Sequence, residues 1–549
     1  MHFRCAMVNC LAWSVVYVCF IEMSNSTAKF GSHTTFGSTL HLLLVLHQHQ
    51  MVLMDTPLPL GKPTAGYENQ YLTQSKIITI AAIIPVKMKQ NHINLRNLNE
   101  IYDEINSFSV INHFITFLLV FLVPSLIVTS AEPSLSGEKM SERKVGIKAR
   151  YDNFALYRLH IKTEEQVKIL QELEEKSDSY VFYGHALRPD QRLTVMVGAH
   201  KLVEIEELIS RFGIGGEILE PNVQSLIDAE AKRIKPSDTK PEDVDWNDYL
   251  QLDTINNWLD YIAQKYDFIE RVDLGQSFNG QTVKGIKFSK NDTNPTIFIE
   301  AGIHAREWIS PATTTFIINQ LITSNRPEVQ DMANNFNWFF FPVVNPDGYR
   351  YTFEKDRLWR KNRKPYGLYL GVDLNRNFDA NWNGTGSSSD PQRYDFCGSG
   401  AFSEPETNNI AEFFKLNGKK ERINTYIALH SFSQLMMFPY GYTTEKPVNY
   451  DDLKVMGEKA VEAIKMKHGK EYVCGSSIET IYPSSGSSSD WVYEKGFANI
   501  SYIIELRGSV ESTNMFILPA DEIIPTGEEI LEAFIALLKE GKSRVAKEK

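Results

Sequence analysis

The stretch Ile303-His304-Ala305-Arg306-Glu307-Trp308 follows an apolar run, Pro295–Gly302, that is typical of a buried β-strand. It places an imidazole and a carboxylate three residues apart, just where the strand would end. With one more imidazole from elsewhere in the chain, these groups form the His₂Glu set that binds a catalytic zinc ion and leaves a fourth position for water. The pair alone is a weak signal, because His-x-x-Glu occurs by chance in many proteins, so the rest of the chain decides its meaning.

Further polar positions follow downstream, each beside an apolar or glycine-rich run: Asn375-Arg376, His430-Ser431, Tyr482 and Glu505. Around them, segments typical of strands and of helices alternate, which predicts an α/β fold. The predicted strands are 283–288, 296–302, 338–344, 425–429 and 501–506, and the predicted helices are 311–323, 451–467 and 522–538. Functional residues of such folds gather at the carboxyl ends of strands, and His304 and His430 both follow predicted strands.

Taken in this order, the motifs resemble those of zinc metallocarboxypeptidases of the A/B type, which are made with an activation prosegment. The resemblance extends from near Val145 to near Leu538. It implies a catalytic α/β domain built on a mixed twisted sheet flanked by helices, preceded by a small α+β prosegment domain. Residues 155–161 alternate like a strand and 164–174 have helical spacing. An unrelated ferredoxin-like domain is the alternative for this segment.

The resemblance also implies roles for single residues. His304, Glu307 and His430 would bind one Zn²⁺, and Asp373 would orient a ligand imidazole. Glu505 would act as general base, although an ion pair with Arg507 is the simpler structural explanation of a charge in an apolar strand. Arg360 would stabilise the oxyanion.

A carboxypeptidase must recognise a free terminal carboxylate, which a guanidinium can do with two parallel hydrogen bonds. By resemblance, Arg376 does this with help from Asn375 and Tyr482. The residues expected to touch the substrate upstream of the cleaved bond are Arg306, Phe432 and Phe516.

The side chain of the released residue should enter a pocket lined by Ser489, Gly441, Ser477 and Ile503. Relatives that release basic residues usually have Asp at the position of Ser489, and relatives that release apolar residues usually have Ile. Since an uncharged pocket cannot offset the desolvation of a cation, we expect neutral apolar or aromatic C-terminal residues. The alternatives are a basic preference through nearby Glu479, or an inactive peptide-binding protein on the same scaffold.

The chain divides by composition into four segments. Residues 1–108 match nothing in the family and are expected to be a mispredicted extension of the reading frame, with a membrane-tethering leader as the alternative. Residues 109–131 contain an apolar run followed by small residues and predict a cleaved secretory signal, with a membrane anchor as the alternative. The prosegment spans 145–233 and the catalytic domain 234–549. A trypsin-like protease should cleave after Arg233, because the nearby lysines 235 and 240 both precede proline.

Charge and cysteine content narrow the remaining possibilities. The formal net charge is −11, which argues against a nucleic-acid-binding surface. We expect a secreted monomer that acts on peptide and protein C-termini and has no membrane contact once the signal is removed. Outside the N-terminal segment only Cys397 and Cys474 remain, and they could form one disulfide bond or stay as two buried thiols.

Overall fold

The computed structural model describes residues 2–7, 15–22, 42–47, 80–82, 147–176, 179–509 and 512–548. The chain divides into two units, Met1–Ser141 and Glu142–Lys549. The described residues of the first unit form an antiparallel sheet of β1 (His2–Met7), β2 (Val15–Glu22), β3 (Leu42–His47) and β4 (Ile80–Ala82), in that order. The predicted signal at 109–131 lies outside the described residues, and both it and the origin of residues 1–108 stay hypotheses.

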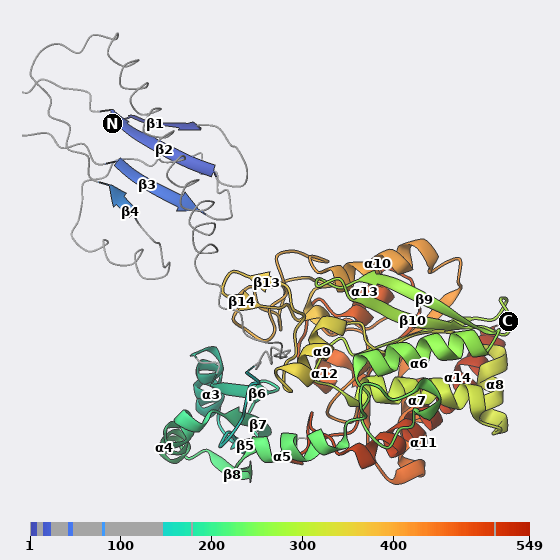
Figure 1. Cartoon of the computed structure of the whole chain (residues 1–549). Coiled ribbons are helices and arrows are strands. Elements are labelled where there is room, and N and C mark those ends of the chain that lie inside the picture. Colours follow the sequence, from blue (N-terminus) through green and yellow to red (C-terminus); the bar gives the residue numbers. More distant parts are fainter. Residues whose placement is uncertain are drawn as a thin grey trace, which may run out of the picture. The chain divides into compact units, whose positions relative to one another are not determined.

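The second unit begins with a small α+β module, as predicted (Figure 1). Its antiparallel sheet has the order β6-β7-β5-β8 and buries Leu159, Val195 and Ile205 against its helices. The elements are β5 (Ala155–Ile161), α3 (Glu164–Lys176), β6 (Tyr180–Tyr183), β7 (Gln191–Val197), α4 (Leu202–Phe212), β8 (Gly215–Glu220) and α5 (Val223–Glu230).

The catalytic part is built on an eight-stranded sheet in the order β17-β16-β18-β15-β11-β12-β10-β9. The central strands β12, β11, β15 and β18 run parallel, and β10 and β16 join them antiparallel on either side, so the sheet is mixed, as expected. The edge strand β9 pairs antiparallel with β10. The strands are β9 (Ile269–Gln276), β10 (Thr282–Phe288), β11 (Thr296–Ala301), β12 (Asn337–Phe341), β15 (Ile423–His430), β16 (Leu435–Phe438), β17 (Val473–Ser476) and β18 (Ile500–Glu505), beside a separate hairpin of β13 (Pro365–Tyr366) and β14 (Tyr369–Leu370).

Helices cover both faces of this sheet (Figure 1). One face carries α6 (Leu252–Lys265), α7 (Ile309–Thr323), α8 (Pro327–Asn335), α11 (Tyr450–His468) and α14 (Ile523–Glu548), and the other carries α10 (Pro405–Asn417) and α13 (Ser488–Glu494). The shorter helices are α9 (Pro346–Glu354) and α12 (Ser477–Thr480), with 3₁₀ turns η1 (Ala199–Lys201), η2 (Ala231–Arg233), η3 (Pro241–Asp243), η4 (Leu374–Arg376) and η5 (Ala520–Glu522).

Every predicted strand and helix of the catalytic domain is present, with shifted ends. The strand predicted to run to residue 344 stops at Phe341, because Pro342 has no backbone N–H to continue the ladder. Helix α14 continues well beyond the predicted residue 538.

Alternation along the central strands decides which face each side chain joins. On β11, Ile297 and Ile299 belong to the core beneath α7, whereas Phe298 belongs to the core beneath α10. The same alternation places Glu300 on the α10–α13 face, together with His430 at the end of β15 and Glu505 at the end of β18. Charged groups are thereby gathered at one edge of one face.

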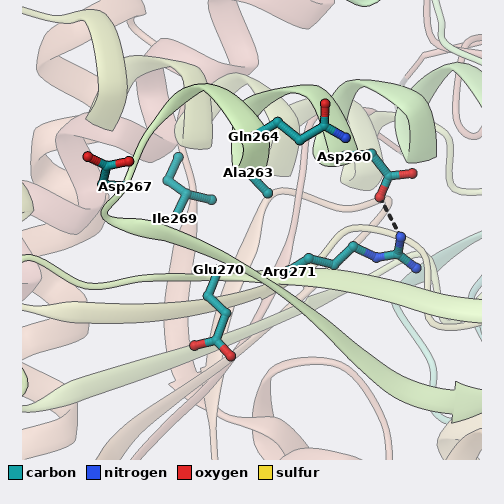
Figure 2. A pocket seen from close by; sticks show the side chains of 7 residues that line it. All are labelled: Asp260, Ala263, Gln264, Asp267, Ile269, Glu270 and Arg271. Atoms are coloured by element: carbon teal, nitrogen blue, oxygen red, sulfur yellow. Dashed lines mark hydrogen bonds and ion pairs between the residues drawn. The ribbon is translucent and has the colours of Figure 1, made fainter.

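A shallow hollow lies at the opposite end of the sheet, between α6 and the edge strand β9 (Figure 2). There Asp260 of α6 forms an ion pair with Arg271 of β9 at 2.6 Å. The hollow shares no residue with the predicted site, so it carries no part of the functional argument.

Candidate active site

The three predicted metal ligands converge in the structure. His304 and Glu307 lie in the turn between β11 and α7, and His430 ends the neighbouring strand β15. Nδ1 of His304 is 2.8 Å from Oε1 of Glu307 and 3.1 Å from Nδ1 of His430, which is itself 3.2 Å from Oε2 of Glu307. All three side chains are buried, and their potential ligand atoms lie within 4.8 Å of one another.

This arrangement fits a divalent ion held by two imidazoles and one carboxylate. Two imidazole nitrogens that face each other need a proton or a cation between them. The observed 3.1 Å between the two nitrogens is close to the separation of two nitrogen ligands on a tetrahedral zinc ion, which is about 3.3 Å. Although burial opposes it, the imidazoles of His304 and His430 hold the pKa of Glu307 far below its usual range. Burial, with a contribution from Arg360, lowers the pKa of His304. A neutral imidazole beside an ionised carboxylate is the protonation pattern that zinc requires.

Asp373 connects the metal ligands to Arg360. Its Oδ1 lies 3.0 Å from Nε2 of His304, and its Oδ2 accepts hydrogen bonds from Nε and Nη2 of Arg360 at 3.0 and 2.8 Å. The remaining terminal nitrogen of Arg360, Nη1, lies 3.7 Å from Glu307. One fully buried carboxylate therefore orients a ligand imidazole and also aims a guanidinium beside the metal ligands.

Glu505 reaches the same place through strand register. In the parallel pairing of β15 with β18, Glu505 is the partner of His430. Burial raises the pKa of Glu505 to about 8, and Glu307 pushes it in the same direction. The simpler explanation, an ion pair with Arg507, does not hold, because Arg507 pairs instead with Glu522 and Glu529. A half-buried carboxyl with a raised pKa beside a predicted metal site is typical of a general base.

Arg376, on η4, lies deep in the site with its guanidinium partly anchored. Its Nε donates to the carbonyl of Gly386 at 2.8 Å and its Nη1 to the carbonyl of Asn375 at 2.9 Å. Its Nη2 has no hydrogen-bond partner among the described residues. Tyr482 is close enough to act electrostatically on both Arg360 and Arg376. The structure thus brings together the three residues predicted to bind a terminal carboxylate.

The predicted upstream contacts form an aromatic cluster. The rings of Phe432 and Phe516 are 4.9 Å apart, and the guanidinium of Arg306 lies 4.0 Å above the ring of Phe516. Tyr183 of the α+β module packs edge-on against both phenylalanines, at 6.1 and 5.5 Å. The module therefore covers these positions.

The four predicted pocket residues lie on adjoining elements and carry no charge. Ser489 of α13 is 1% exposed and its hydroxyl is 2.8 Å from that of Ser501 on β18. Ser477 donates to the Phe438 carbonyl, Gly441 donates to Asp490, and Ile503 lies two residues before Glu505 on the same face of β18. By contrast, Glu479 is exposed, and its carboxylate accepts a hydrogen bond from Ser476.

Cys397 and Cys474 do not form a disulfide bond, so this alternative is wrong for the structure. Both are free thiols. Cys397 is fully buried next to Asn383, whereas Cys474 lies on β17 and faces Gly457 of α11. They belong to different regions of the fold, and burial raises the pKa of both, so they behave as packing residues.

The predicted cleavage residue is held by the catalytic part. The side chain of Arg233 pairs with Asp248 at 2.7 Å and with Asp521 at 3.0 Å, and its carbonyl accepts a hydrogen bond from the backbone of Tyr249. Lys232, just before it, is exposed. A protease that cleaves after Arg233 must first detach this segment, because substrates bind proteases as extended chains.

Sequence reasoning missed the contacts that fasten the module. Glu230, the last residue of α5, forms a buried bidentate pair with Arg357. His185 packs edge-on against Tyr482 at 4.9 Å and lies beside Tyr394 and Glu174. No spacing pattern in the sequence reveals the contacts of Glu230 with Arg357 and of His185 with Tyr482 and Tyr394, since these form only when the module docks.

Sequence reasoning also passed over Glu300, although a charged residue inside the apolar run 295–302 was a visible signal.

Within the described residues, no helix is both long and apolar enough to cross a bilayer.

Two family models match the chain. One, described as "Zinc carboxypeptidase", matches residues 255–533, and the other, described as "Carboxypeptidase activation peptide", matches residues 157–230. These spans agree with the two parts of the second unit.

Individual proteins resemble the chain over the same region. Zinc carboxypeptidase A 1 of Anopheles gambiae is 44% identical over 72% of this chain and 91% of its own length. Carboxypeptidase B of Astacus astacus is 42% identical over 54% of this chain and 95% of its own length. Among solved structures, carboxypeptidase A from Helicoverpa armigera aligns with a TM-score of 0.64 and 28% identity, covering 71% of this chain and 98% of that one.

Proposed function

We propose, from the premise that this chain belongs to the zinc carboxypeptidase family, that it is a secreted enzyme releasing single apolar or aromatic residues from peptide C-termini. Zinc is its cofactor, and the activation peptide makes it a zymogen. The observation that carries the proposed site is the convergence of His304, Glu307 and His430 beside Glu505.

Each catalytic group has one task. His304, Glu307 and His430 would hold the zinc ion, which would supply the Lewis acidity that lets a water lose a proton near neutral pH. The Glu505 carboxylate takes that proton and then delivers it to the nitrogen of the leaving amino acid. Arg360, aimed by Asp373, donates hydrogen bonds to the oxygen that becomes negative when the carbonyl is attacked.

The terminal carboxylate is recognised by Arg376, Asn375 and Tyr482. Because two nitrogens of Arg376 are engaged by carbonyls, its position is fixed before a substrate arrives. Preorganised donors of this kind bind a carboxylate with less loss of entropy. This arrangement supports an exopeptidase, since an internal peptide bond offers no such charge.

Preference for an apolar or aromatic residue is supported by the pocket. Ser489, Gly441, Ser477 and Ile503 offer no charge, and the Ser489 hydroxyl already pairs with Ser501. A lysine or arginine side chain would lose water there without gaining a counter-charge. Glu479, the alternative source of charge, is exposed and turned towards Ser476.

Activation follows from how the module covers the site. Tyr183 packs on the upstream aromatic cluster and His185 on Tyr482, so a peptide cannot use these positions while the module is docked. We propose that a trypsin-like protease cleaves after Arg233 once the segment detaches from Tyr249 and Asp248. N-terminal sequencing of the activated protein tests this, and a mature chain that begins after Lys240 contradicts it.

One experiment tests the proposed activity. The trypsin-treated protein is assayed on peptides ending in Phe or Lys, with free or amidated C-termini, with and without a metal chelator. We expect cleavage of the free Phe peptide alone, abolished by the chelator and restored by zinc. Cleavage of amidated peptides contradicts exopeptidase recognition, and a strong preference for Lys contradicts the pocket assignment.

Secretion and a monomeric state complete the proposal. Expression of the full chain in insect cells should release into the medium a protein that begins near residue 131, and light scattering should give the mass of one chain. A protein retained in the membrane fraction contradicts the secretory signal.

A further inference from the structure

Glu300 is a buried carboxyl for which the proposed chemistry has no use. It lies on β11, is fully buried, and has no cationic partner among the described residues. Burial raises its pKa. Its Oε1 accepts a hydrogen bond of 2.7 Å from the hydroxyl of Ser488, and its Oε2 has no hydrogen-bond partner within the described part of the chain. A buried polar group that is only half satisfied is costly, so a fold retains it for a reason.

The partner of Glu300 leads directly to the substrate-binding side of the site. Ser488 is the first residue of α13, and its backbone N–H donates to Oδ1 of Asn375 at 2.9 Å. The backbone N–H of Asn375 donates a hydrogen bond to Asp373, whose carboxylate also accepts one from Arg360. The path from Glu300 to Asn375 therefore consists of two hydrogen bonds through one residue.

This path fixes the direction in which the Asn375 amide points. An amide side chain has one acceptor and one donor end, and the two ends exchange places if the group turns over. Because Ser488 N–H occupies Oδ1, the amide nitrogen Nδ2 is the end left to donate. A donor is what a substrate carboxylate needs, whereas an amide oxygen would repel it.

We propose that Glu300 is a positioning residue for recognition of the substrate's terminal carboxylate: by anchoring Ser488 at the start of α13, it holds Asn375 with its amide nitrogen towards the carboxylate. This rests on the proposed role of Asn375. Glu300 touches no substrate atom and acts only through Ser488.

The test uses the zinc-loaded, activated enzyme and four variants. Glu300→Leu and Ser488→Ala each break the anchoring bond, and Glu300→Gln retains an acceptor oxygen for Ser488. Tyr472→Phe is the matched control, since it removes a buried hydroxyl that has no hydrogen-bond partner among the described residues and lies near Glu529 and Arg507, away from Glu300. Zinc content and unfolding temperature are recorded for every variant.

We expect Glu300→Leu and Ser488→Ala to raise KM for a free-carboxylate peptide about tenfold, the loss typical of one misplaced hydrogen bond to a charged group. The calorimetric dissociation constant of L-phenylalanine, which carries the same carboxylate, should rise in parallel. Affinity for acetohydroxamate, a metal-directed ligand without a carboxylate, should stay within about twofold, as should kcat. Glu300→Gln and Tyr472→Phe should resemble the unmodified enzyme.

Two outcomes overturn the proposal. If Ser488→Ala is folded, binds zinc and keeps its KM, Glu300 has no route to the carboxylate, and this holds even where Glu300→Leu fails to fold. If affinity for both ligands falls equally, the role of Glu300 is general stability. A separate variant, Asn375→Ala, distinguishes failure of the positioning role of Glu300 from failure of the role of Asn375. An unchanged KM in this variant refutes the binding of the substrate carboxylate by Asn375, on which the proposal for Glu300 rests.

Discussion

The proposed metal centre and the proposed pocket for the released side chain are neighbours on one strand, yet they are built on opposite principles. Glu505 ends β18, and Ile503 and Ser501 precede it on the same face. Around Glu505 nearly every group is charged and tied to another, as His304, Asp373 and Arg360 illustrate. Around Ser501 the groups are neutral and small. Chemistry demands particular residue types at fixed distances, whereas selectivity needs only shape and the absence of charge.

The largest effect should come from the charged region. Glu505→Gln keeps the size of the side chain but cannot accept a proton, so kcat should fall about a thousandfold or more. Zinc content, measured by atomic absorption, should remain at one per chain, because the three ligands are untouched. A variant with more than a tenth of the original kcat would mean that another group is the base.

Recognition of the carboxylate should be the next most sensitive. Arg376→Lys keeps the charge but loses the planar fork, so kcat/KM should fall about a hundredfold. Arg350→Lys, at a partly exposed arginine that forms a bidentate pair with Asp253 away from the site, is the matched control and should change little. Steady-state kinetics on a free-carboxylate peptide measures kcat/KM for both variants. An equal fall in kcat/KM in the two variants would contradict the special role of Arg376.

The neutral pocket should be convertible with a moderate effect. Ser489→Asp places a carboxylate on the floor, and the ratio of kcat/KM for Lys over Phe peptides should rise at least about tenfold. Ser489→Asn, similar in size but uncharged, should leave this ratio nearly unchanged. If both variants only lose activity, Ser489 does not face the released side chain.

The last effect is on stability and not on activity, and it comes from a carboxyl group at the edge of the neutral region. Burial raises the pKa of Asp490 to about 7, whereas the unfolded chain has the ordinary value of 3.8. Between these values the folded state holds a proton that the unfolded state has lost, so the free energy of unfolding should fall with rising pH, by at most about 1.4 kcal/mol per pH unit. The decline begins near pH 4 and ends above pH 7.

Asp490→Asn cannot ionise and should flatten this part of the profile. Urea unfolding of the two proteins between pH 4 and pH 8 measures the difference. Parallel profiles would mean that Asp490 is already charged when the pocket forms.

The residues of the charged region could be predicted from the sequence, whereas the contacts within the neutral region could not. The metal ligands, Glu505 and Arg376 were predictable because their chemistry allows few substitutes, and the strands that carry them have clear apolar runs. The Ser489–Ser501 pair and the path from Glu300 to Asn375 were not predictable, because hydroxyl groups and amides are common and their partners lie far away in sequence. The end of β12 at Phe341 lies between these two cases. Pro342 signals the end of the strand, but the apolar run continues past it to Val344 and hides that signal.

Sequence patterns could predict neither the contacts of the docked module nor the state of the two cysteines. Glu230 with Arg357 and Tyr183 with Phe516 meet across two folded surfaces, and no local spacing encodes that. For Cys397 and Cys474, counting thiols left pairing open, and only their separate positions in the fold decide against it.

The pairing of His430 with Glu505 across β15 and β18 has a consequence for how the enzyme comes into being. A slip of one residue between these strands would turn one of the two side chains to the opposite face. Whichever side chain turns away, hydrolysis would be lost, because the proposed metal ligand His430 and the proposed base Glu505 are both needed. A correctly paired sheet is therefore a precondition for the activity that removal of the module would release.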